Sequence, residues 1–140
     1  MTEQQPSPDD PGITDAVQLL RRIHPDWIVP DQQGGRKLSR QAYQDQRAEG
    51  GTAAMSVFVE SRLLELGLSA VDVLDGHTGY GLAAFPASAA RSCGLTVVWA
   101  PSPADGRRGL AHAHVLGDKT GSRQKALVSA STVRILPDMP

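Results

Sequence analysis

Two histidines stand two residues apart in the segment GLAHAHVLGDK, residues 109–119. On a β-strand successive side chains alternate between the two faces of the sheet, so His112 and His114 are predicted to point the same way. The intervening Ala113 and the following Val115 then point to the opposite face. One face of this predicted strand is apolar, and the other carries two imidazoles that could bind an anion, bind a metal or be structural.

A metal site needs further ligands besides two imidazoles. The other possible ligands stand in no recognisable metal-ligand motif: His24, His77, Glu60, Asp72 and Asp75. We therefore predict no metal site and keep a small metal-dependent enzyme as an alternative. If the two histidines are structural, they should be partly buried and hydrogen-bonded to the backbone.

A second cationic segment, LLRRIHPDW, could supply the partners of an anion pocket. Read as a strand, it puts Arg22 and His24 on one face of a sheet. A guanidinium is a rigid two-pronged donor for phosphate, and a neighbouring imidazole adds a charge that switches near neutral pH. Arg21 lies on the other face, where we expect an ordinary solvated side chain.

A turn with two glycines, GGRKLS, follows at residues 34–39. Its backbone freedom, together with Arg36 and Ser39, suits a loop that closes over an anion. The same composition also suits a solvated turn.

Composition limits the possible partners and the compartment. Fourteen Lys and Arg against fifteen Asp and Glu give a formal net charge of -1, so nucleic acid is not indicated as a partner. A single cysteine excludes an internal disulfide and fits a reducing compartment. The chain has no apolar run long enough to cross a membrane, so we expect a soluble, cytoplasmic protein without a membrane partner.

The order of the segments predicts one α+β domain. Residues 1–12 are acidic and rich in proline, which predicts a disordered leader, and residues 13–140 are predicted to form the domain. From Met55 onward short strands alternate with short helices, giving a mixed β-sheet of five or six strands. The segment LTVVWAP at residues 95–101 is the clearest strand, and we expect it to be central.

The segments LLRRIHP, GGRKLS and MSVFVESRLLEL, in that order, resemble the front half of RES-type domains, a branch of the ADP-ribosyltransferase-like fold. The resemblance covers about Leu19 to Leu66. It implies a split mixed sheet that binds NAD in a central cleft. By this resemblance Arg22 matches the first-strand arginine, Arg36 the turn arginine, and Ser61 the polar residue after the second strand.

The segment AHAHV is similar to a strand of RNA 2'-phosphotransferases, which share the same broad fold and grip phosphates with arginines and histidines. This second resemblance implies that His112 and His114 line the same cationic cleft. Both resemblances indicate a pocket for a nucleotide diphosphate.

Together these observations predict an NAD- or nucleotide-binding, ADP-ribosyltransferase-like protein that cleaves or transfers ADP-ribose. Arg22 and Arg36 would hold the pyrophosphate, and His24 and Ser39 would orient the nicotinamide ribose. Glu60 is the candidate acid that would stabilise the developing oxocarbenium ion.

A different class of function remains open. The small size, the acidic leader and the lack of a complete catalytic constellation also suit a non-enzymatic protein that binds a protein partner. An antitoxin, an immunity protein or an accessory subunit would be of this kind, and its histidines would be structural.

Overall fold

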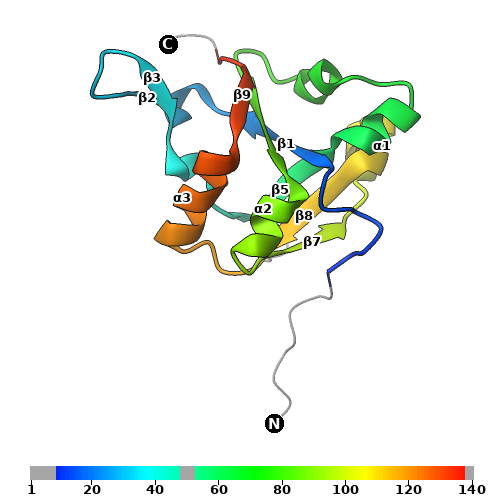
Figure 1. Cartoon of the computed structure of the whole chain (residues 1–140). Coiled ribbons are helices and arrows are strands. Elements are labelled where there is room, and N and C mark those ends of the chain that lie inside the picture. Colours follow the sequence, from blue (N-terminus) through cyan, green and yellow to red (C-terminus); the bar gives the residue numbers. More distant parts are fainter. Residues whose placement is uncertain (1–8, 48–52, 138–140) are drawn as a thin grey trace.

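The computed structural model describes residues 9–47 and 53–137 of the chain (Figure 1). Its main sheet contains six strands, in the spatial order β7 (Thr96–Trp99), β8 (His112–Leu116), β5 (Ala53–Val59), β1 (Gln18–Ile23), β6 (Gly81–Pro86) and β9 (Thr132–Ile135). Three further strands are short: β4 (Gln46–Arg47) pairs with β5, while β2 (Ile28–Pro30) and β3 (Arg36–Leu38) form a separate hairpin.

Helices cover both faces of the sheet. One face is covered by α2 (Ala87–Ser92), α3 (Gly121–Ala130) and the 3-10 helix η2 (Arg40–Tyr43), with α2 and α3 beside each other (Figure 1). The other face is covered by α1 (Glu60–Glu65) and the 3-10 helices η3 (Ala70–Leu74) and η4 (Pro103–Ala111), and η1 (Pro25–Trp27) follows β1. The described residues form one small α+β domain, as predicted.

Alternation along the strands creates two separate hydrophobic cores. In β1, Leu19 and Ile23 belong to the core under α2 and α3, whereas Leu20 belongs to the core under α1 and η3. In β8, Ala113 and Val115 pack into the first of these cores. The predicted alternation on both strands is confirmed, because a pleated strand must send neighbouring side chains to opposite faces.

The prediction of a mixed sheet was wrong, since every strand pair among the described residues is antiparallel. A parallel neighbour needs a crossover that returns the chain along the full length of a strand. The segment that contains α1 and η3 does return the chain in this way, since β5 and β6 both pair antiparallel with β1 and therefore run in the same direction. β1 lies between these two strands, so the return creates no parallel pair.

The prediction that Val97, Val98 and Trp99 form a central strand was also wrong, because β7 lies at one end of the strand order. At the outer edge of β7, backbone groups of Val97 form hydrogen bonds with Asp9 and Asp10, two residues of the predicted leader. The N–H of Asp10 donates to the Val97 carbonyl (2.9 Å), and the N–H of Val97 donates to Asp9 Oδ1 (2.8 Å). Asp9 and Asp10 are therefore placed against the domain, and residues 1–8 lie outside the described residues.

A capping box fixes the chain between α1 and η3, which pack into the same core. The Ser69 N–H donates to Asp72 Oδ2 at 2.7 Å, which starts η3 directly after the turn that ends α1. That turn is made by Gly67, whose φ of +77° is a left-handed conformation that glycine adopts without steric cost. The serine and glycine signals therefore position η3 over β1, where it contacts the candidate site.

The sheet is split between β1 and β5. These two strands pair only at Leu19 with Val59 and at Leu20 with Phe58. Beyond this point β1 continues against β6 as far as Ile23, while β5 continues against β8. The two halves of the sheet diverge, and the split positions the candidate site.

Candidate functional site

A cavity of about 130 Å³ lies where β1 and β5 diverge. Its walls come from β1, η1, β5 and the loop between η3 and β6: Arg21, Arg22, Trp27, Ser56, Phe58, His77 and Tyr80. Two arginines thus border an enclosed space, and none of the lining residues is an aspartate or glutamate.

Arg21 fills the split itself. Only 3% of this residue is exposed, which corrects the expectation of a solvated side chain. Its guanidinium donates to three backbone carbonyls, from Nε to Ala42 (2.9 Å), from Nη1 to Ser56 (2.9 Å) and from Nη2 to Gln44 (3.3 Å). It forms no ion pair with any described residue. Burial lowers the pKa of Arg21 to about 10, so the side chain still carries a positive charge at neutral pH.

Arg22 points to the opposite face of β1, as predicted. Its Nε donates to the Val73 carbonyl at 2.7 Å, and its guanidinium carbon lies 4.8 Å from the centre of the Phe58 ring. Its Nη2 atom is buried and has no hydrogen-bond partner among the described residues. Burial, followed by the charge of Arg108, lowers the pKa of Arg22. An unsatisfied donor on a partly buried cation is a position where a ligand oxygen would be stabilised.

Asp105 supplies part of the counter-charge from η4. Its Oδ1 lies 4.0 Å from Arg22 Nη2 and 3.5 Å from Arg108 Nη2. Burial raises the pKa of this carboxyl, but a hydrogen bond from Ser102 and the charges of the two arginines outweigh burial, so the pKa is lowered. Asp105 therefore stays ionised. At 4.0 Å it does not satisfy the Arg22 donor by a hydrogen bond.

Three aromatic rings line the cavity, those of Trp27, His77 and Tyr80, and the ring of His24 packs against two of them. Centroid distances are 5.9 Å from His24 to Trp27, 5.4 Å from His24 to Tyr80 and 5.5 Å from His77 to Tyr80. His24 is oriented by its own turn, since its Nδ1 accepts a hydrogen bond from the Asp26 N–H at 3.0 Å. This aromatic rim, defined as His24, Trp27, His77 and Tyr80, offers surfaces on which a planar ring can stack.

The two histidines of β8 share one face, as predicted, but Phe58 stands between them and the arginines. The His112 ring lies 5.2 Å from the Phe58 ring and 5.1 Å from the His114 ring. His112 is buried, and its Nδ1 donates to the Ala100 carbonyl at 2.7 Å. That hydrogen bond fits the structural interpretation of His112. Neither histidine belongs to the residues that line the cavity.

The half-buried His114 makes stability depend on pH. Burial, followed by the neighbouring His112, lowers the pKa of His114 below its ordinary 6.5. On acidification the unfolded chain takes up a proton at this position before the folded chain does, so the free energy of unfolding decreases. We expect wild type to lose more stability than His114→Gln between about pH 7 and pH 5. Urea unfolding midpoints across this range provide the measurement, and parallel curves for the two proteins would contradict the assignment.

The other predicted site residues lie elsewhere. Glu60 begins α1 and binds Arg134 of β9 through both carboxylate oxygens, one of them at 2.9 Å. Ser61 is exposed on α1. Arg36 is exposed on the β2–β3 hairpin, and the Ser39 hydroxyl accepts from the Gln41 N–H to cap η2. The structure therefore places Arg22 in the cavity wall and His24 beside the lining residues Trp27 and Tyr80. Glu60, Ser61, Arg36 and Ser39 do not line the cavity.

Several cavity residues were missed from the sequence. Trp27, Ser56 and Phe58 carry no motif, and only the fold brings them to the split. His77 and Tyr80 had a weak sequence signal, since each directly follows a glycine in the segment DGHTGY. Gly76 and Gly79 have positive φ angles of +79° and +85°, which turn both side chains back toward β1.

Comparison with known proteins assigns no family to this arrangement: no protein-family model, curated protein or solved structure matches the chain. Within residues 9–47 and 53–137, no group of three or more His, Cys, Asp or Glu residues is placed to hold a metal ion. No helix within these two ranges is long and apolar enough to cross a bilayer.

Proposed function

We propose that the cavity binds the phosphate of a nucleotide, NAD or a related one, in a domain of the ADP-ribosyltransferase-like type. The observation that carries the proposal concerns Arg22, a residue of the cavity wall, whose buried Nη2 has no hydrogen-bond partner among the described residues. A phosphate oxygen would accept from this donor and form the charge-assisted hydrogen bond that arginine makes best.

The electrostatics of the split also favour an anion. Arg21 forms no ion pair within the described residues, and burial lowers its pKa; the charge of Arg22 acts in the same direction, while the charge of Asp45 opposes it. Two neighbouring cations in a partly buried site are destabilising unless a negative charge approaches them. A bound phosphate would offset that repulsion, which Asp105 reduces only from a distance.

The dimensions favour one end of a nucleotide rather than the whole molecule. A cavity of about 130 Å³ can hold a phosphate group, whereas complete cofactors occupy pockets of roughly 300 to 1,000 Å³. The ribose and the base would lie outside, with the base stacked on the aromatic rim.

The divergence of β1 from β5, with an arginine on the first strand at the split, supports the resemblance to the ADP-ribosyltransferase-like fold. The cleavage step has weaker support. An oxocarbenium ion is stabilised by a nearby carboxylate, but none lines the cavity and Glu60 is engaged by Arg134. The proposal is therefore nucleotide binding, and glycosidic cleavage is not part of it.

Thermal unfolding with added ligands tests the proposal. ADP-ribose and AMP should raise the Tm of wild type by several degrees at saturation, by mass action on the folded state. Uncharged adenosine should raise it far less, because the arginines are expected to recognise the phosphate. Arg22→Gln should remove most of the shift produced by the two phosphorylated ligands.

The control is Arg62→Gln, which removes a partly exposed arginine of α1 that pairs with Glu65 at 3.6 Å and does not line the cavity. This variant should keep the full ligand shift. Each shift is measured against the same variant without ligand, so a change in basal stability does not enter. An unshifted wild type, or an Arg22→Gln variant that responds like wild type, would refute nucleotide binding in this cavity.

A further inference from the structure

A second concave surface lies between the β2–β3 hairpin and α3, and no residue lines both it and the cavity. This hairpin groove has a volume of about 450 Å³ and is formed by Val29, Lys37, Leu38, Ser39, Arg40, Lys125, Val128 and Ser129. Three of these residues are cations, three are aliphatic and two carry hydroxyl groups. No acidic residue is among them.

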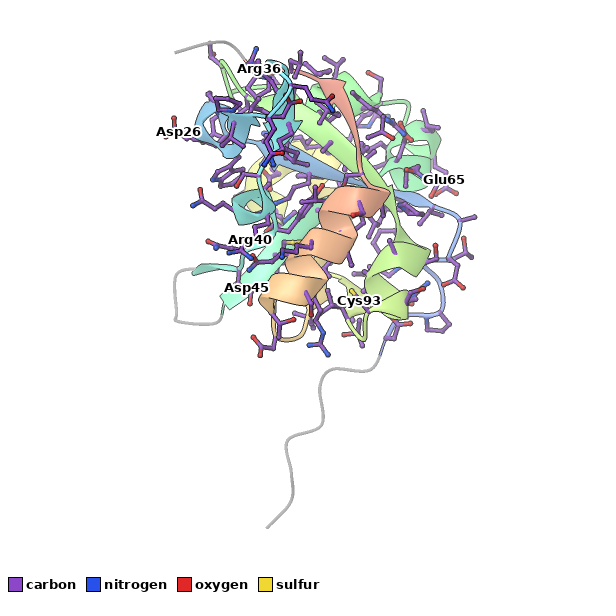
Figure 2. All side chains as sticks on the ribbon, turned by 60° about the vertical axis from the view of Figure 1, so that its left-hand side comes forward. Asp26, Arg36, Arg40, Asp45, Glu65 and Cys93 are labelled. Atoms are coloured by element: carbon purple, nitrogen blue, oxygen red, sulfur yellow. The ribbon has the colours of Figure 1, made fainter. Side chains whose placement is uncertain are left out.

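The cations of the hairpin groove are available to a partner. Lys37, Arg40 and Lys125 are exposed, and none of them forms a salt bridge with a residue in the described ranges. Arg36, also exposed and also without a salt bridge there, extends the positive surface along the hairpin. Figure 2 shows Arg36 and Arg40 on the side of the molecule where α3 faces the viewer. In a chain with a net charge of -1, this is a local concentration of positive charge.

The nearby acids are engaged in other interactions. Asp31 Oδ1 accepts from the Gln33 N–H (2.9 Å) and the Gly35 N–H (2.7 Å), which closes the hairpin turn. Asp45 pairs with Lys119 at 2.7 Å. Neither carboxylate forms an ion pair with the cations of the groove, so the positive charge there remains uncompensated.

We infer that the hairpin groove docks an acidic, amphipathic segment of a partner protein. Carboxylates of the segment would pair with Lys37, Arg40 and Lys125, while its aliphatic side chains would cover the partly buried Val29 and Val128. The apolar part of the groove distinguishes this occupant from a nucleic acid. Binding of a polyanion depends mainly on the number of phosphates neutralised and gains little from aliphatic side chains.

Fluorescence anisotropy with a short fluorescein-labelled peptide of alternating Glu and Leu tests the inference. Wild type should bind this peptide, and added salt should weaken binding because the charges are exposed. The double variant Lys37→Glu/Lys125→Glu should weaken binding by about tenfold or more. A peptide of alternating Glu and Ser should bind more weakly than the Leu peptide, because it lacks the aliphatic side chains.

Arg107→Glu is the matched control, since Arg107 is an exposed cation of η4 outside the groove. It should bind the peptide as wild type does, and so should Arg22→Gln, which separates this site from the nucleotide cavity. Three results would overturn the inference: no binding of the Leu peptide, equal binding by the charge-reversed variant, or tighter binding of a fluorescein-labelled oligothymidylate through the same two lysines.

Discussion

Replacing Arg21 by methionine should lower the free energy of unfolding by about 3 to 5 kcal/mol, because it leaves buried polar groups without partners. The guanidinium satisfies the carbonyl oxygens of Ala42, Gln44 and Ser56, which lie on two separate segments. Methionine has a similar length and no donor. The Ala42 carbonyl, whose hydrogen bond is buried, would then be orphaned, and the partly buried hydrogen bonds to Ser56 and Gln44 would be lost as well.

Loss of the Arg21 guanidinium should also loosen the connection between β1 and β5. Where β1 and β5 diverge, Arg21 replaces the missing strand pairing by joining β1 to β5 and to the end of η2. Arg21→Lys supplies one ammonium group in place of three nitrogens in a fixed plane, so it should recover only part of the lost stability. Urea unfolding followed by tryptophan fluorescence measures both variants.

The neighbouring Arg22→Met is the matched control. It removes a guanidinium from the same strand, but that group makes one backbone hydrogen bond, to Val73, and is more exposed. We expect this variant to lose about 1 to 2 kcal/mol. If Arg21→Met is no less stable than Arg22→Met, the assignment of Arg21 as the support of the split is wrong.

These two arginines show how far the sequence could lead. Alternation along a strand is a local property, so it placed Arg21 and Arg22 on opposite faces and His112 beside His114 correctly. The alternation could not show that the face with Arg21 would be buried, with its guanidinium enclosed by other residues. Arg21 has the composition of a surface residue, and its burial depends on carbonyls contributed by residues 21 to 35 positions further along the chain.

The expected catalytic carboxylate illustrates the same limit. Glu60 was predicted because it is the only acid at the end of a predicted strand, and in the structure it directly follows β5 as the first residue of α1. Its partner Arg134 lies 74 positions away on β9, and this pairing became visible only with the sheet order. In the same way Arg36 and Ser39 have the types expected for anion binding, but Arg36 is exposed on the β2–β3 hairpin, Ser39 caps η2, and neither lines the cavity.

Replacing Gly109 by alanine should cost about 3 kcal/mol, near the upper end for overpacking, because the new methyl group would collide with backbone. A Cβ at this position would stand 1.8 Å from the Ser102 carbonyl oxygen and 3.3 Å from Asp105 Cβ. The Gly109 carbonyl also accepts from the Ser102 N–H at 2.9 Å, so the two segments cannot separate without losing that hydrogen bond. The segment carrying Asp105 would have to move away from Arg22.

Gly106→Ala, in the same 3-10 segment, separates this steric effect from backbone strain. Gly106 has a φ of +68° and a ψ of −140°, a conformation that side chains rarely adopt, but open space around its Cβ position, so alanine there should cost about 2 kcal/mol. Urea unfolding of the two variants under identical conditions makes the comparison. A Gly109→Ala variant at least as stable as Gly106→Ala would contradict the close approach of Gly109 to Ser102. It would also contradict the position of Asp105 beside Arg22 and Arg108.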